Sequence, residues 1–255
     1  MAGVTAISLP GIVRAGTISA NISAIAGSVP SEMQPGDNDD SLTILFQGDS
    51  ITDGGRSHNQ DWNHLMGSGY VYILASSLWY RYPERKFQFI NRGVSGNKIT
   101  DLAARWQTDT IDVKPDVLSI LVGVNDVNSV IDNSKDMVDS ARYEKEYRAL
   151  LHQAKEKLPG VELILCEPFI LPLGHTKDRY PQWLDEIKKR QASVLKLSKE
   201  FDTMYVNFQD VFNEALERAP ADYWIWDGIH PMPAGHQMMA NHWTEIVHKK
   251  LAYIK

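Results

Sequence analysis

The stretch Ile44-Leu-Phe-Gln-Gly-Asp-Ser-Ile-Thr52 decides the fold of this chain. Its apolar start predicts a short buried strand that ends at Gly48 and presents Asp49 and Ser50 at its carboxyl end. In an open parallel sheet, ligands bind in the crevice outside the carboxyl ends of the strands. A serine at that place can be a nucleophile if a base and an oxyanion site lie nearby. Taken alone, Gly-Asp-Ser is more simply interpreted as a polar turn, so the rest of the chain must decide.

Short apolar runs alternate with amphipathic stripes along the rest of the chain. The predicted strands are Leu42–Phe46, Phe87–Ile90, Val117–Val122, Val161–Leu165 and Met204–Val206. The predicted helices lie near residues 69–82, 99–106, 143–158, 184–201, 211–216 and 233–251. This alternation predicts an α/β domain with a five-stranded parallel sheet between two layers of helices, a flavodoxin-like three-layer sandwich.

Composition and motifs exclude several classes of protein. A net charge of −6 leaves no basic face for phosphates, so we expect no nucleic-acid partner. The single cysteine, Cys166, excludes an internal disulfide and a cysteine-rich zinc site. The histidines form no convincing ligand set, and His236 and His242 are expected to be exposed on the last helix. Phosphate-loop, dinucleotide and Gly-x-Ser-x-Gly motifs are missing. We therefore expect neither a metal nor a cofactor.

Residues 1–41 are predicted to be a leader and linker that precede a folded domain at 42–255. Val4 to Val13 is mostly apolar, and Val13-Arg-Ala15 has the small-residue pattern of a signal cleavage site, although no positively charged stretch precedes it. One interpretation is the remainder of an export signal, which would place the protein in the periplasm or outside the cell. The other is a disordered leader on a cytoplasmic protein. The apolar run is too short and interrupted to span a bilayer.

Four polar blocks are predicted to meet at one edge of the sheet. Ser50 follows the first strand, Gly96 the second and Asn125 the third, while Asp227 and His230 precede the last helix. Each block alone is a weak signal, because a turn residue, a backbone hinge or a surface histidine would explain it equally well.

Together the four blocks resemble the SGNH, or GDSL-type, esterases and acylhydrolases. The resemblance is carried by Gly48-Asp-Ser50, Asn91-Arg-Gly-Val-Ser-Gly96, Gly123-Val-Asn-Asp126 and Asp227-Gly-Ile-His-Pro231, and it covers residues 42–240. It implies the SGNH hydrolase fold and a serine esterase that works through an acyl-enzyme intermediate. Val124 stands where the family often has a second glycine.

The resemblance also implies a role for each site residue. Ser50 would be the nucleophile, His230 its base, and Asp227 the carboxylate that fixes the imidazole tautomer. The backbone N–H groups of Ser50 and Gly96 and the side-chain amide of Asn125 would hold the oxyanion. Asp49 and Asp126, which belong to the same motifs, are interpreted as structural residues that hydrogen-bond loop backbone.

The sequence leaves three alternatives for the function and its substrate. Trp62, Trp224 and Trp226 are predicted near the cleft, and aromatic faces that stack on sugars favour a carbohydrate deacetylase acting on a small acylated substrate. Trp224 and Trp226 could equally be core or rim packing. The loop Phe169–Leu173 could wall an apolar groove, which would favour a lysophospholipase or thioesterase. A non-catalytic binding module with the same fold is the third hypothesis, and the oligomeric state stays unknown.

Overall fold

All six residues of the first strand, β1 (Thr43–Gly48), are buried, because the strand is covered on both faces. The computed structural model describes residues 41–59 and 63–251 of the chain. The leader and linker predicted for residues 1–41 therefore lie outside the described residues, apart from Ser41, and stay a prediction. So does the position of Trp62.

The five strands form one all-parallel sheet in the order β2-β1-β3-β4-β5. This confirms the predicted α/β fold, and each strand end lies within two residues of its predicted position. The strands after β1 are β2 (Gln88–Asn91), β3 (Val117–Leu121), β4 (Glu162–Cys166) and β5 (Met204–Val206).

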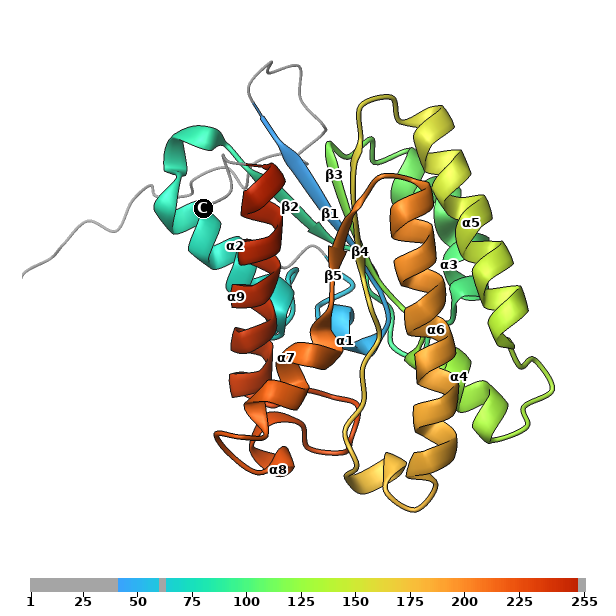
Figure 1. The fold of residues 1–255 in the computed structure, drawn as a ribbon. Coiled ribbons are helices and arrows are strands. Elements are labelled where there is room, and N and C mark those ends of the chain that lie inside the picture. Colours follow the sequence, from blue (N-terminus) through green and yellow to red (C-terminus); the bar gives the residue numbers. More distant parts are fainter. Residues whose placement is uncertain (1–40, 60–62, 252–255) are drawn as a thin grey trace, which may run out of the picture. The chain divides into compact units, whose positions relative to one another are not determined.

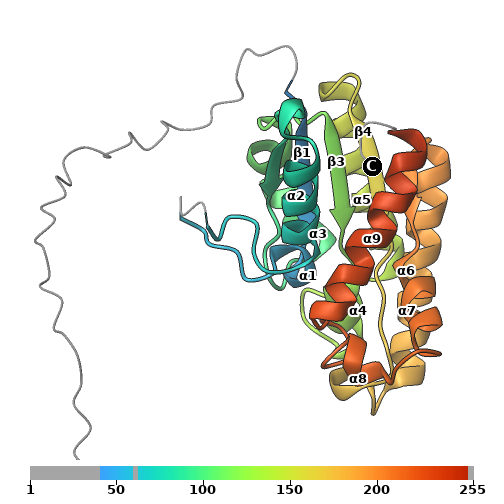
Figure 2. The same cartoon turned by 90° about the vertical axis from the view of Figure 1, so that its left-hand side faces the viewer.

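Helices cover both faces of the sheet, as Figure 1 shows. One layer contains α2 (Tyr70–Arg81), α7 (Phe208–Ala215) and α9 (Pro233–Lys250), and the other contains α3 (Ile99–Trp106), α5 (Ser140–Lys157) and α6 (Tyr180–Glu200). In Figure 2, α2 and α9 lie side by side over the near face of the sheet. The shorter elements are α1 (Ser50–Asp53), η1 (Pro83–Arg85), the π turn η2 (Gln107–Ile111), α4 (Val124–Ile131), η3 (Gly174–Thr176) and α8 (Ala221–Trp224).

The period-two alternation of β1 divides the core into two clusters. Ile44 and Phe46 point toward α2 and α9, whereas Leu45 points toward the α3 and α5 layer. Trp243 of α9 packs against Phe46 and donates its Nε1–H to the hydroxyl of Ser119 on β3, 3.0 Å away. Buried side chains thus pack against both faces of β1, the strand that leads to Ser50.

The Phe169–Leu173 segment differs from the expectation that it walls an apolar groove. Phe169, Ile170 and Leu171 are at most 1% exposed and pack in the core, so they do not form the wall of an apolar groove. This removes the observation on which the lipid-substrate hypothesis depended. Within residues 41–59 and 63–251, no helix is both long and apolar enough to cross a bilayer.

Candidate active site

Ser50 opens α1, a single helical turn that begins where β1 ends. Asp49 caps this turn by accepting a hydrogen bond from the N–H of Ile51 at 3.1 Å. A side chain at Gly48 would not fit, because its β-carbon would lie 2.3 Å from the carbonyl oxygen of Leu121 on β3. The close approach of β1 and β3 thus requires glycine at position 48, two residues before Ser50. The backbone N–H of Ser50 lies at a helix N-terminus, where such groups are free of intrahelical partners.

The structure brings the three predicted triad residues together. Ser50 Oγ lies 2.7 Å from Nε2 of His230, and Nδ1 of His230 lies 2.7 Å from a carboxylate oxygen of Asp227. The other oxygen of Asp227 accepts the backbone N–H groups of Ile229 and His230 at 2.9 and 2.7 Å. The loop thus orients the carboxylate through its own backbone. This geometry is the one that general-base activation of a serine requires.

The charges in this loop support the same arrangement. The hydrogen bond with Asp227 raises the pKa of His230 above its ordinary value, while partial burial opposes the shift. Partial burial works to raise the pKa of Asp227, but the ring of His230 and two backbone N–H groups hold it below its usual range. The pair therefore favours an ionised carboxylate beside an imidazole that binds a proton readily.

The raised pKa of His230 predicts how the catalytic rate depends on pH. Only the neutral imidazole can accept the Ser50 proton, so kcat/KM should fall as the pH drops through the pKa of His230. Because that pKa is raised, the decline should begin above 6.5, the ordinary histidine value. The slope should approach a tenfold loss for about each pH unit. A kcat/KM profile with p-nitrophenyl acetate checks this, and a rate that stays flat from neutral to strongly acidic pH would exclude a histidine base.

The loop that carries Asp227 and His230 is held by backbone hydrogen bonds that the sequence did not predict. The carbonyl of Gly228 accepts the N–H of Leu171 at 3.0 Å, and the carbonyl of Asp227 accepts the N–H of His175 at 2.8 Å. Gly228 has φ +93°, and a β-carbon there would lie 2.3 Å from the carbonyl oxygen of Leu173. The Asp-Gly dipeptide was the available signal, since it marks a tight turn. Leu171 and His175 thus support the loop of Asp227 and His230 through backbone hydrogen bonds.

The remaining oxyanion candidates lie in a turn and a helix that touch each other. Val94 to Asn97 form a turn closed by the N–H of Asn97 on the carbonyl of Val94, and the N–H of Val94 donates to the carbonyl of Gly48 at 3.1 Å. Gly96 in this turn has φ +84°, which explains the glycine, whereas a β-carbon there would meet no described atom within 4 Å. Backbone conformation, not close contact, therefore selects glycine at this position.

Asn125 lies in the first turn of α4, next to the Gly96 turn. Its side-chain nitrogen donates to the carbonyl of Asn97 at 3.1 Å. A primary amide carries two N–H donors. One of them thus connects α4 to the turn, and the second is the donor that the resemblance assigns to the oxyanion. These roles stay predictions, because no bound substrate tests them.

Asp49 and Asp126 have the structural contacts expected of them. Asp49 caps α1, and both carboxylate oxygens of Asp126 accept the N–H of Ile99 at 3.1 and 3.3 Å. Burial raises the pKa of each carboxyl to about 7. The Asp49 carboxylate thus stabilises the first turn of α1, and the Asp126 carboxylate connects α4 to the start of α3.

The last helix contributes a histidine whose environment differs from the prediction. His236 is not freely exposed: its Nδ1 accepts the N–H of Tyr70, the first residue of α2, at 3.1 Å. Burial lowers its pKa to about 4. His242 is also partly buried, and it bonds the side-chain oxygen of Asn207 at 2.9 Å. Both histidines tie α9 to neighbouring segments.

The two tryptophans of the C-terminal loop lie in different environments. Trp224 is 5% exposed, packs in the core and donates its Nε1–H to the carbonyl of Ala219. These contacts favour the packing interpretation of Trp224 over a role in substrate binding. Trp226 is 61% exposed, and its ring lies 5.9 Å from that of His230 at an interplanar angle of 24°. Trp224 is the last residue of α8 and packs inward, whereas Trp226 lies in the loop that follows this helix and faces solvent.

Comparison with known proteins gives a consistent result. The family described as GDSL-like lipase/acylhydrolase matches residues 46–238 of the chain. An acetylxylan esterase of Geobacillus stearothermophilus is 35% identical over 202 residues, which cover 77% of this chain and 90% of the esterase.

Solved structures agree with the sequence comparison. A protein of Parabacteroides merdae described as a GDSL-like lipase superposes with a TM-score of 0.76 at 43% identity, over 80% of this chain and 94% of its own. The structure of the Geobacillus stearothermophilus acetylxylan esterase superposes with a TM-score of 0.72 at 33% identity, over 81% of this chain and 94% of its own. The residues that match the family model include all four polar blocks.

Proposed function

Because this chain belongs to the GDSL-like lipase/acylhydrolase family and is an esterase of that family, we propose that it removes acetyl groups from the hydroxyls of a carbohydrate. The observation that carries the proposal is the exposed indole of Trp226, which lies nearly parallel to the ring of His230. An aromatic face beside the catalytic base can stack on a sugar ring while the ester carbonyl reaches Ser50. The similarity to an acetylxylan esterase supports the same substrate class.

The proposed reaction has two halves. Ser50 Oγ attacks the acetyl carbonyl as its proton passes to Nε2 of His230, and Asp227 stabilises the imidazolium that forms. The N–H groups of Ser50, Gly96 and Asn125 hold the oxyanion. His230 then returns the proton to the departing sugar hydroxyl, which leaves an acetyl-serine. A water molecule activated by His230 hydrolyses this ester and restores Ser50.

The acyl-chain preference tests the proposal. We expect acetyl esters to be hydrolysed faster than butyryl and octanoyl esters, with acetylated xylooligosaccharides among the good substrates, because the apolar Phe169–Leu171 segment is buried in the core. Release of acetate and of each longer acid is measured at equal concentrations of p-nitrophenyl esters and sugar esters. A preference for octanoyl over acetyl would reject a carbohydrate deacetylase and favour the long-chain hypothesis.

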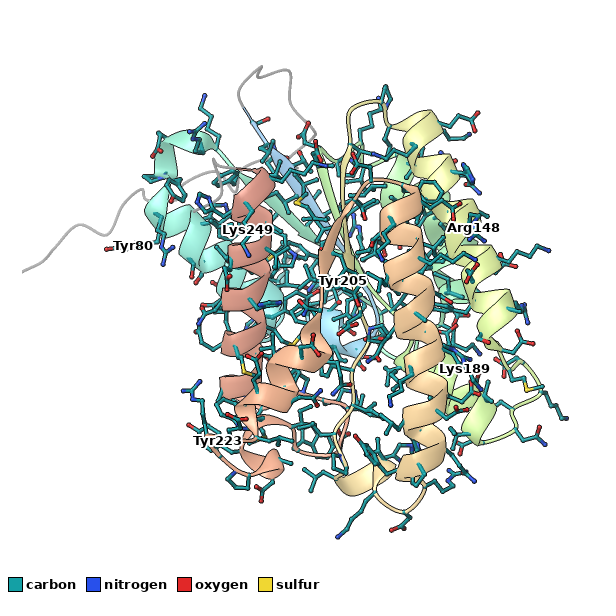
Figure 3. The ribbon with its side chains drawn as sticks, in the orientation of Figure 1. Tyr80, Arg148, Lys189, Tyr205, Tyr223 and Lys249 are labelled. Atoms are coloured by element: carbon teal, nitrogen blue, oxygen red, sulfur yellow. The ribbon has the colours of Figure 1, made fainter. Side chains whose placement is uncertain are left out.

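A tryptophan substitution separates sugar binding from chemistry. Trp226→Ala should raise KM for acetylated xylooligosaccharides by about tenfold, the loss expected for a stacking contact of roughly 1.4 kcal/mol, with little change for p-nitrophenyl acetate. Tyr80→Ala is the matched control, because Tyr80 is 87% exposed on α2 and is labelled in Figure 3 well apart from α8. An equal loss on both substrates would make Trp226 a support for His230 instead of a sugar platform.

Export of the protein is consistent with this substrate class, since an exported enzyme would meet a polymeric carbohydrate outside the cell. Support for export is limited to the apolar residues 4–13 and the small-residue pattern at 13–15. The binding-module hypothesis is disfavoured by the intact hydrogen-bonded chain from Ser50 through His230 to Asp227. A protein without catalytic function has no need of that chain.

A further inference from the structure

The turn that carries Gly96 lies directly against the helical turn that carries Ser50. A β-carbon at Gly93 would lie 2.3 Å from the backbone nitrogen of Asp53, the last residue of α1. Asn91 strengthens this contact, because its side-chain nitrogen donates to the carbonyl of Thr52 at 2.7 Å while its oxygen accepts the N–H of Gly93. Two of the proposed oxyanion donors thus belong to segments that touch each other.

The carboxylate of Asp53 connects these segments. One of its oxygens accepts both the backbone N–H of Ser95, at 3.1 Å, and the hydroxyl of Ser95, at 2.9 Å. The other accepts the N–H of Arg56 at 3.2 Å, and the guanidinium of Arg56 donates to the carbonyl of Gly93 at 2.9 Å. Asp53 is only 5% exposed, whereas Ser95 lies at the surface, so the bonds between them are partly buried. Hydrogen bonds to a charged acceptor are stronger than those between neutral groups.

Ser95 immediately precedes Gly96, so the Gly96 N–H belongs to the peptide unit that starts at the Ser95 carbonyl. Both donor groups of Ser95 are held by one carboxylate, and that carboxylate is three residues from Ser50 on the same helical turn. Asp53 therefore restrains the residue that directly precedes Gly96. None of the four sequence blocks that indicate the catalytic residues contains Asp53.

We propose that Asp53 is a positioning residue for the oxyanion site: through Ser95 it aims the Gly96 N–H at the position that the acyl oxygen occupies when it becomes the oxyanion. This inference rests on the proposed function, since it takes Gly96 as an oxyanion donor. Asp53 itself touches neither substrate nor the reacting atoms. Its effect should appear in the transition state, where the oxyanion forms, and hardly in the binding of the neutral ester.

The test compares Asp53→Asn, Ser95→Ala and the double variant in the full chain. With p-nitrophenyl acetate, Asp53→Asn should lower kcat per titrated active site by about 10- to 100-fold, with KM changed by less than about twofold, as expected for a misplaced oxyanion donor. Ser95→Ala, which removes one of the two donors, should lose roughly 3- to 10-fold. The double variant should be little worse than Asp53→Asn, because both changes break one contact.

An inhibitor that mimics the tetrahedral intermediate gives a second measurement, which substitution of a purely structural residue would not change. Phenylboronic acid forms a negatively charged tetrahedral adduct with a serine hydroxyl, and one oxygen of this adduct can lie in the oxyanion site, so its inhibition constant should weaken in proportion to the loss of kcat/KM. Ser95→Thr keeps the hydroxyl and should restore activity. Asp139→Asn, at the N-terminus of α5, and Ser198→Ala, a buried hydroxyl on α6, are matched controls that should keep wild-type turnover.

Three outcomes would overturn the inference. Asp53→Asn could lower only the thermal midpoint, with unchanged kcat per titrated site and unchanged boronate inhibition, which would make Asp53 a purely structural residue. If Asp53→Asn does not fold, Ser95→Ala decides, and wild-type kcat in that variant would refute the positioning role. A wild-type protein that neither hydrolyses the ester nor reacts at Ser50 would instead refute the proposed function, and this inference with it.

Discussion

Replacing Ser50 by alanine is expected to lower kcat for acetyl esters on the order of 10⁶-fold, the loss known for the nucleophile of a serine–histidine unit. The reason is the 2.7 Å contact between Ser50 Oγ and Nε2 of His230, which joins nucleophile and base in one proton-transfer unit. Turnover of p-nitrophenyl acetate by purified variants measures the loss. The folded fraction is checked by the thermal unfolding midpoint, which the loss of one hydroxyl should change little.

The same contact predicts how a second substitution combines with the first. His230→Ala should cost about as much as Ser50→Ala, and the double variant should be no worse than either single variant, because the two residues act as one unit. His242→Ala is the matched control: this histidine lies on α9 and bonds Asn207, away from Ser50. A double variant much slower than both singles would show that Ser50 and His230 act independently, which contradicts the assignment.

Replacing Asp227 by asparagine is expected to lower kcat by roughly 10⁴-fold, the loss recorded when a triad carboxylate becomes an amide. The substitution removes the charge that stabilises the imidazolium and permits the wrong tautomer of His230, whose Nδ1 lies 2.7 Å from the carboxylate. It also removes the hydrogen bond that raises the pKa of His230, so the residual activity should persist to lower pH than in the wild type.

A pH profile of kcat/KM for Asp227→Asn measures both effects together. Asp139→Asn is again the control, since that carboxylate only caps α5. Activity within about tenfold of wild type would mean that the loop backbone alone orients His230, and Asp227 would then be a structural residue.

Much of the fold followed from the sequence. The apolar runs of β1 and β3 are buried on both faces, as parallel strands between two helical layers must be, and their ends could be located because Gly48 and Gly123 interrupt them. Helices with a clear apolar stripe, such as α5, were also predictable. The short helices α1 and α4 were not, because their formation depends on caps and neighbours more than on periodicity.

The site was predictable only where a motif marks it. Ser50, Gly96 and Asn125 could be expected at one edge because the carboxyl ends of parallel strands share it, whereas Asp227 and His230 were assigned to the same site through the family resemblance. Burial of Trp224, Phe169 and Leu171 could not be foreseen, since an aromatic or apolar residue in a loop looks the same whether it packs inward or outward. The Asp53–Ser95 contact joins residues 42 positions apart and has no local signature.

The esterase activity requires Ser50 to be an activated nucleophile, and reaction with a fluorophosphonate tests this most directly. Mass spectrometry of the digested wild-type protein should show one phosphonyl group, on the peptide that contains Ser50. The label should be lost in Ser50→Ala and strongly slowed in His230→Ala. An unlabelled wild-type protein, or a label on another residue that persists in Ser50→Ala, would contradict the account.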